Sequence, residues 1–225
     1  MLGIKLSVPI ACFRKGMARE YLETERIPPP ATCYGFLLAL VGETDRERHL
    51  RVKISPVLLK ESERSVVLRT VWRVKKTPLG SPGNTRPDYQ QILTDVQLLI
   101  WLDSSDEEKH DGTALVDQSL EKRVKTALDP EGRGQIARFG GLSLGESTHL
   151  VNEVSLYYDG KKVVADSGVG EDVNPQIMLQ DSNGALTWPV WVDHVGAQGT
   201  RYVTGALVSG GLKPPKTADM PVIQN

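Results

Sequence analysis

The feature that most constrains this chain is a run of three prolines directly before an apolar segment, in "RIPPPATCYGFLLALVGE" (residues 26–43). Proline holds φ at about −65° and carries no N–H, so residues 28–30 make a stiff, extended approach. Thr32 can then cap a helix, and Gly42 can end it. Between them, apolar residues recur one helical turn apart, at Phe36, Leu37, Leu40 and Val41. The sequence therefore predicts a helix at about 32–42 whose start is held in one place.

This helix start has two interpretations. In the first, the prolines only deliver the chain into a helix that is buried in the core. In the second, the unpaired N–H groups of the helix N-terminus bind an anion such as phosphate. Gly35 lies in the first turn, where the lack of a side chain lets a ligand approach the backbone. The residues by themselves leave both interpretations open.

Hydrophobic patterning along the rest of the chain predicts a mixed α+β fold. Apolar residues alternate or cluster as in strands at 3–10, 50–60, 65–76 and 88–103, and with helical spacing at 113–129. The turn "ESE" between the second and third strands is short enough for a hairpin. With one further strand, the order strand, helix, strand, strand, helix, strand is that of a ferredoxin-like (RRM-type) βαββαβ body.

The remaining segments complete a single expected domain over residues 1–225. The Pro- and Gly-rich stretch "TPLGSPGNTRP" (77–87) predicts an exposed loop that projects between two strands like a finger. Residues from about 150 to 212 are strand-like and Gly-rich, and the tail 213–225 is expected to be loose. No internal repeat is evident.

Composition narrows the class of protein. The chain has 225 residues, 24% of them charged, and a net charge of −1, whereas a free-standing nucleic-acid binder is often strongly basic. A subunit that touches nucleic acid over a small area remains compatible with this balance. Two cysteines, Cys12 and Cys33, cannot form a disulfide framework, which favours a reduced, cytoplasmic protein. We expect no secretion signal and no membrane span, because no uncharged apolar stretch reaches about 18 residues.

Catalytic and metal-binding patterns are weak. The four histidines are scattered without metal-ligand spacing, and neither a phosphate-binding loop nor a nucleophile elbow occurs. We therefore expect no metal and no cofactor. His149, near Ser147 and Thr148, is the one candidate general acid or base, although a single histidine is more often structural.

A Gly-rich segment, residues 132–151 ("GRGQIARFGGLSLGESTHLV"), holds five glycines together with Arg133 and Arg138. Glycine permits tight bends and a close ligand approach, although the same pattern also fits a flexible connector. Binding to a phosphate backbone needs several basic positions. The loop after the first strand, the finger and the Gly-rich segment supply them at Arg14, Lys15, Arg19, Arg26, Lys75, Lys76, Arg86 and Arg138.

Three stretches together resemble the Cas5 family of CRISPR systems, within the RAMP superfamily. "PPPATCYGFLLALVGE" is similar to its N-terminal signature, "NTRPDYQQILTDVQLLIWL" to the strand after its thumb loop, and "RFGGLSLGESTHLVNEV" to its Gly-rich segment. The residues of these three stretches are most similar to the myxobacterial and cyanobacterial group, which is allied to type I-B. The resemblance extends to about residue 160, and the last sixty or so residues match loosely.

The resemblance implies a non-catalytic, cytoplasmic subunit of the type I Cascade complex. Such a subunit binds the 5′ handle of the CRISPR RNA and contacts the large subunit and the backbone subunits, while target DNA is read at the level of the complex by base pairing. Its body is ferredoxin-like, with a thumb that here corresponds to about 76–90. The candidate RNA-binding residues are then Arg14, Lys15, Arg19, Arg26, Thr32, Tyr34, Gly35, Lys76, Arg86, Arg138, Gly140, Gly141 and His149.

Two other functions remain as alternatives. One branch of the family cuts precursor RNA without metal, using a Tyr, a Lys and a His. This chain has Tyr34 near the right motif, but its only Lys-His pair, Lys109–His110, lies in an acidic loop outside the matched motifs. The other alternative is a protein scaffold that does not touch RNA. Defence and transposon-associated roles are not distinguished by the sequence.

Overall fold

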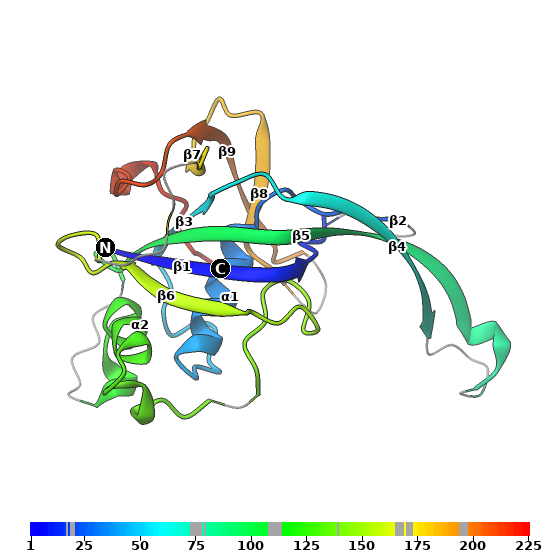
Figure 1. Cartoon of the computed structure of the whole chain (residues 1–225), viewed down its shortest axis with the longest axis horizontal. Coiled ribbons are helices and arrows are strands. Elements are labelled where there is room, and N and C mark those ends of the chain that lie inside the picture. The colour runs from blue at the N-terminus through cyan, green and yellow to red at the C-terminus, as the bar shows by residue number, and fades with distance from the viewer. Residues whose placement is uncertain are drawn as a thin grey trace.

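The computed structural model describes residues 1–16, 18, 21–72, 78, 80–107, 114–138, 140–164, 169, 173–193 and 198–225. Within these residues, nine strands form one sheet, in which the main path has the order β6-β1-β5-β3-β7-β9-β8 (Figure 1). The short β2 (Tyr21–Leu22) and the long β4 (Glu63–Trp72) pair with β5 outside this path. The mixed α+β class expected from the sequence is therefore confirmed.

The first core layer lies between the sheet and its two helices. β1 (Leu2–Ala11) and β5 (Thr85–Asp103) pair antiparallel, and alternate residues of each point to one face of the sheet. On this face the helices α1 (Pro30–Leu40) and α2 (Leu120–Leu128) pack against the strands. The layer includes the fully buried side chains Ile4, Leu6, Leu37, Leu98, Ile100 and Val124.

The start of α1 differs from the expectation. The helix begins at Pro30 with Pro29 as its N-cap, and no side chain among the described residues caps it. Because Pro29 is already extended, its carbonyl accepts the N–H groups of Thr32 and Cys33, at 2.9 and 3.1 Å. The predicted capping role of Thr32 is therefore wrong. Proline at the first helical position is common, because an N–H there would have no partner in the helix.

The strands β3 (Lys53–Leu58) and β4 do not form the expected hairpin with each other. Both pair antiparallel with β5, β3 along residues 98–103 and β4 along residues 85–94. The change of partner occurs at Asp95, whose φ of 53° lies in the left-handed region. β4 and residues 85–94 of β5 form a long ribbon, here called the arm, which extends away from the body (Figure 1). The predicted finger is therefore the end of this arm.

The opposite face of the sheet carries a second, smaller core. Trp101 is its largest buried side chain, and its indole N–H donates to the carbonyl of Gly211 at 2.7 Å. Val57, Leu99 and Met220 are buried around it. The tail, which was expected to be loose, is instead bonded to the start of β3, where the Ile54 N–H donates to the carbonyl of Pro221 at 2.9 Å.

The strands after β5 were predicted in part. β6 (Glu153–Tyr158), β7 (Gln176–Gln180), β8 (Leu186–Trp191) and β9 (Arg201–Ser209) all lie within the strand-like region expected at about 150–212, although no separate strand was expected at the position of β7. The predicted helix at 113–129 is shorter, because α2 begins at Leu120 after a separate turn of 3-10 helix, Leu115–Asp117. In the described part of the chain, no helix is both long and apolar enough to cross a membrane.

Candidate nucleic-acid interface

The Gly-rich segment passes from the end of α1 to the base of the arm. At one end, a Cβ on Gly42 would lie 2.1 Å from the carbonyl oxygen of Ala137, so only glycine fits beneath the segment. Further along, Gly145 has a φ of 90°, and a Cβ there would lie 2.5 Å from the carbonyl oxygen of Cys12. The segment therefore contacts the end of β1. The loop that follows, which holds the candidates Arg14, Lys15, Arg19 and Arg26, is here called the basic loop.

A cleft of about 320 Å³ opens between α1, the Gly-rich segment and the end of β8. Thr32 and Gly35 line it from the helix, and Ser143 and Gly145 line it from the Gly-rich segment. A Cβ added to Gly35 would meet no atom within 4 Å, so this turn of α1 is open to an approaching group. The cleft joins two of the three motifs that the sequence singled out.

Tyr34 forms part of the wall of this cleft. Its side chain is buried, and its hydroxyl donates to the carbonyl of Arg46 at 2.7 Å. Burial raises the pKa of Tyr34 above its ordinary value. Next to it, the Arg46 guanidinium lies 4.3 Å from the centre of the Trp191 ring and donates to the carbonyl of Val192 at 2.9 Å. Arg46 and Trp191 were not among the candidates, because only the fold brings β8 against α1.

At the base of the arm, a polar network connects the arm to the Gly-rich segment. His149 Nδ1 accepts the backbone N–H of Cys12 at 3.1 Å, and its Nε2 lies 4.0 Å from Glu146. The carboxylate of Glu146 accepts from Gln90 on β5 at 2.8 Å and from Arg69 on β4 at 3.1 Å. Burial lowers the pKa of His149, although Glu146 opposes this effect.

The basic loop is partly occupied by internal contacts. Arg14 is exposed and donates to the carbonyl of Ala18 at 2.7 Å, while Lys15 lies 3.8 Å from the carboxylate of Glu23. Arg26 pairs with Glu61 and donates to Gln176 at 3.1 Å, neither of which is a candidate residue. Arg19 lies outside the described residues.

The remaining candidates lie on the arm and along the Gly-rich segment. Arg86 pairs with Asp88 on β5, and Lys76 lies outside the described residues. Arg138 is exposed and, with Arg133, lines a second cavity of about 330 Å³ between the ends of α1 and α2. Gly140 and Gly141 are exposed, and Gly140 has a φ of 80°.

The fold thus brings together the start of α1, the Gly-rich segment, the end of β1 and the base of the arm. Arg69, Gln90 and Glu146 join these parts and were not predicted. Arg69 lies outside the three matched stretches, and Gln90 and Glu146 lie within two of them without a pattern that marks them as partners. Among the described residues, no group of three or more His, Cys, Asp or Glu could hold a metal ion. Lys109 and His110 lie outside the described residues.

The chain was compared with family models, with curated proteins and with solved structures. No family model matches the chain. A curated protein of Myxococcus xanthus (strain DK1622), "CRISPR-associated protein Cas5", is 48% identical over 209 residues, which cover 92% of this chain and 90% of the relative.

Two solved structures share the fold at 14% sequence identity. One, titled "CRISPR RNA-guided surveillance complex", has a TM-score of 0.54 and covers 96% of this chain and 95% of its own. The other, titled "Crystal structure of Cas protein", has a TM-score of 0.50 and covers 92% and 93%. The extent and identity of the curated match decide the family: the chain belongs to the Cas5 family of CRISPR-associated proteins.

Proposed function

We propose that this protein is a non-catalytic subunit of a type I CRISPR surveillance complex (Cascade) that binds the 5′ handle of the CRISPR RNA. In this role it anchors the large subunit and the backbone subunits, and the complex finds its DNA target by base pairing. The observation that carries the proposal is the path of the Gly-rich segment, which joins the open turn of α1 to the base of the arm. This path makes one continuous surface of motifs that are far apart in the sequence.

The sheet order supports a ferredoxin-like body for this surface. β6, β1, β5 and β3 lie side by side, with α1 between β1 and β3 in the chain and α2 between β5 and β6. Such bodies bind single-stranded RNA, whose bases can be splayed apart. In the proposed complex, Arg14, the cleft at Gly35, and Arg138 contact handle nucleotides.

The hydrogen bonds of His149 and Tyr34 favour RNA binding over RNA cleavage. A metal-independent nuclease needs a general base whose nitrogen can reach the attacking 2′-hydroxyl. Nδ1 of His149 already accepts a backbone N–H, and the hydroxyl of Tyr34 is buried against a carbonyl. Incubation of the protein with repeat RNA in EDTA is expected to leave the RNA intact, and cleavage would overturn the non-catalytic role.

The handle-binding role is tested by the salt dependence of affinity. For a single strand, removing one cation that neutralises a phosphate reduces the slope of log affinity against log salt by about 0.7. Replacing Arg14 and Arg138 together by Gln should therefore weaken binding to a handle of about eight nucleotides and reduce the slope by about 1.4. Replacing the exposed Lys161 and Lys162 in the same way is the matched control. An unchanged slope in the arginine variant would remove both arginines from the interface.

A second measurement distinguishes a binder from a scaffold. The chain is co-expressed with the neighbouring genes and a repeat–spacer RNA, and protein–RNA crosslinks are mapped in the purified complex. Crosslinks between handle nucleotides and the basic loop or the Gly-rich segment are the expected result. RNA that co-purifies without any crosslink to this chain would indicate a protein scaffold.

A further inference from the structure

Residues 142–151 of the Gly-rich segment form a small closed hairpin, which we call the bracing hairpin. Ser143 and Leu150 are bridged antiparallel in it. At its turn, the N–H of His149 donates to the carbonyl of Glu146 at 2.9 Å. The position of the Glu146 backbone is therefore fixed by hydrogen bonds within the hairpin itself.

The bracing hairpin is also attached to the body of the protein on both sides of Glu146. Leu144 is buried in the core on the helix side of the sheet. Gly145 packs against the backbone of Cys12, and Nδ1 of His149 accepts the N–H of the same cysteine at 3.1 Å. Because its neighbours in the hairpin are held in this way, Glu146 has a firm base from which its side chain can act.

From this base, the Glu146 carboxylate bonds to both strands of the arm. It accepts from Gln90 on β5 at 2.8 Å and from Arg69 on β4 at 3.1 Å. These two residues belong to successive residue pairs on one face of the arm, Val67–Gln90 and Arg69–Asp88. Gln90 is 1% exposed, so loss of Glu146 would leave a buried amide N–H without this acceptor.

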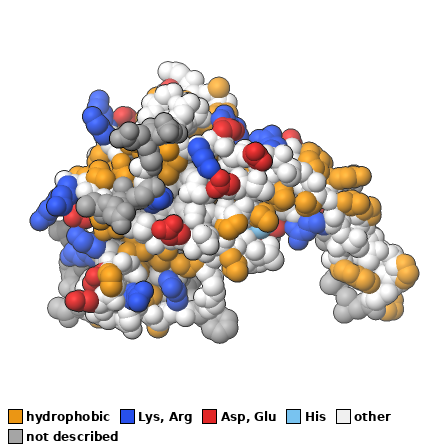
Figure 2. Space-filling view, viewed as in Figure 1, with side chains coloured by type: hydrophobic (Ala, Val, Ile, Leu, Met, Phe, Trp, Pro, Cys, Tyr) orange, Lys and Arg blue, Asp and Glu red, His pale blue; other side chains and the backbone are white. Residues whose placement is uncertain are grey.

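The direction of the arm depends on what holds its base, because a two-stranded ribbon by itself is marginally stable in water. At the base, Asp95 has a φ of 53°, which departs from extended backbone, and β2 pairs with β5 as far out as Tyr89. The bond from Arg69, opposite Asp88, lies one residue farther out. In Figure 2 the arm projects from the body, with open space between its outer part and the rest of the molecule. A small change of angle at the base therefore displaces the outer part most.

We propose that Glu146 is a positioning residue, which sets the direction of the arm relative to the body by bonding to Arg69 and Gln90 at once. The proposal rests on the proposed function for its consequence: an arm that already has its final direction in the free chain needs less ordering when the chain enters the complex. Glu146 then acts on affinity through the arm, without a contact of its own with RNA.

Distances between two spin labels on the free chain test this positioning. The labels are attached through Thr70→Cys on the arm and Lys122→Cys on α2, both at exposed positions. The native Cys12 and Cys33 are buried and stay as they are. We expect one narrow distance distribution in the chain with Glu146, and a broader or shifted one in Glu146→Ala. The same distribution in both chains would overturn the proposal.

Three further variants separate positioning from a purely structural role. Glu146→Gln keeps one acceptor oxygen and should restore most of the narrow distribution. Arg69→Met removes the bond at an exposed position of the arm and should change the distances in the same direction as Glu146→Ala. Ser147→Ala, at the next, exposed position of the same turn, is the matched control. Thermal unfolding is measured in parallel, and a lower Tm with unchanged distances would show a structural role alone and refute the proposal.

Affinity for handle RNA connects the positioning to the proposed function. If about a tenth of the free chains keep the arm in its binding direction, the apparent affinity falls about tenfold. We expect this loss in Glu146→Ala and a much smaller one in Glu146→Gln. Both variants lack the negative charge, so an equal change in the two would assign the effect to charge and overturn positioning as its cause.

The two proposals fail in different ways. Unchanged distances in Glu146→Ala refute the positioning role, whatever the RNA result. A wild-type chain that binds no handle RNA refutes the handle-binding role, while a broadened distribution in Glu146→Ala would still establish the positioning role.

Discussion

At the scale of the residue, His149 shows how one side chain can hold two distant segments. Its Nδ1 accepts the N–H of Cys12, which directly follows β1, and its Nε2 faces Glu146. Only the neutral ring can accept at Nδ1, and protonation would bring a second donor against the N–H of Cys12. Burial, reinforced by Arg69, lowers the pKa of His149, and the charge of Glu146 only partly offsets this effect.

This lowered pKa predicts a pH dependence of stability. In the unfolded chain His149 titrates at about 6.5, and in the folded chain it titrates lower, so the unfolded state binds more protons in between. The free energy of unfolding should therefore fall as the pH drops below about 6.5, by up to about 1.4 kcal/mol per pH unit until the folded pKa is reached. His149→Asn, whose Oδ1 can replace Nδ1 as the acceptor, should remove this part of the slope.

The measurement is urea unfolding at several pH values between about 5 and 7.5 for the wild type and the variant, a range that spans the ordinary histidine pKa. The difference between the two curves isolates His149 from the carboxylates, which titrate mainly at lower pH. Parallel curves would show that the protonation of His149 is not linked to folding.

At the scale of the element, α2 depends on a residue from outside its own sequence. Its N-cap, Ser119, makes no side-chain cap, and the Leu120 N–H instead donates to both carboxylate oxygens of Glu107, at 3.2 and 3.0 Å. Glu107 also lies 2.5 Å from Nδ1 of the buried His49. Burial alone would raise the pKa of Glu107, but the hydrogen bonds from His49 and Ser104 outweigh it and lower the pKa.

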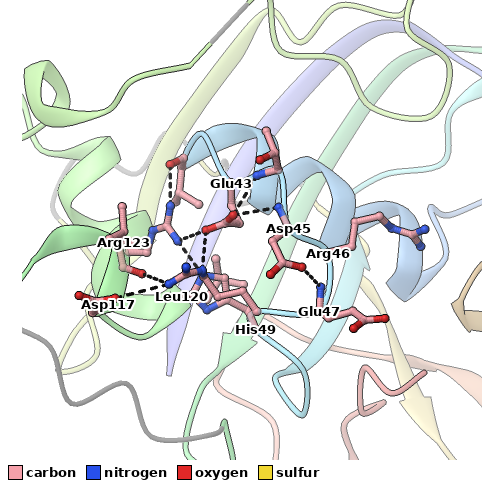
Figure 3. A network of polar contacts seen from close by, with 12 residues as sticks. Glu43, Asp45, Arg46, Glu47, His49, Asp117, Leu120 and Arg123 are labelled. Atoms are coloured by element: carbon pink, nitrogen blue, oxygen red, sulfur yellow. Dashed lines mark hydrogen bonds and ion pairs between the residues drawn. The ribbon is translucent and has the colours of Figure 1, made fainter.

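The same network ties α2 to the end of α1 (Figure 3). Arg123 of α2 lies 2.9 Å from Nε2 of His49, forms an ion pair with Glu43 at 2.6 Å, and donates to the carbonyl of Val41 at 3.1 Å. Because Arg123 can only donate, His49 accepts at Nε2 and carries its proton at Nδ1, toward Glu107. The relative position of the two helices is thus set by a buried polar network in addition to apolar packing.

Removal of Glu107 should lower the free energy of unfolding, because Glu107 takes part in the polar network that links the two helices. Glu107→Ala leaves the Leu120 N–H and the buried His49 without their acceptor, and breaking a buried charged network of this kind costs about 3–5 kcal/mol. Glu107→Gln keeps one acceptor and should cost less, and the exposed Glu131→Ala is the control. Chemical unfolding measures the loss. Equal stability of the Ala variant and the control would show that apolar packing alone places α2.

At the scale of the whole molecule, the tail completes the sheet and both cores. β7 pairs with the end of β3, at Val57 and Leu58, and the tail bonds to its beginning, where Lys53 is bridged to Val222. Ile223 is buried in the core on the helix side, and Met220 is buried in the core on the other side. The last residues therefore contact both layers, which explains why a segment rich in Pro and Lys is fixed.

This arrangement predicts a large effect from a small change near the C-terminus. Ile223→Ala removes buried methyl and methylene groups and should lower the free energy of unfolding by about 2–5 kcal/mol, as for other buried aliphatic side chains. Asn225→Ala, at an exposed position two residues later, should change it by less than about 0.5 kcal/mol. Thermal unfolding of the two variants distinguishes a fixed tail from a loose one, for which both changes would be small.

The parts of the candidate site that could be predicted are those with a local signal. The Pro run, the glycines of the segment 132–151 and Arg14 are visible as patterns. The fold brings the start of α1, which follows the Pro run, and the glycine segment to one cleft. The sequence does not show which groups the hydroxyls of Tyr34 and Thr32 face. Whether a hydroxyl faces a ligand or a carbonyl depends on Arg46, twelve residues from Tyr34, and on β8, more than 150 residues away.

By itself, the sequence determined the elements whose pattern is local: the alternation that makes β1 and β5, the prolines that begin α1, and the helical period of α2. The tertiary structure alone decided how they are joined. β5 is 19 residues long, so it can pair with β3 and β4 in succession, and this long-range pairing replaced the local hairpin. The tail and the Glu107 network likewise depend on contacts between residues far apart in the chain. No local pattern records such contacts, because their free energy exists only once the sheet has formed.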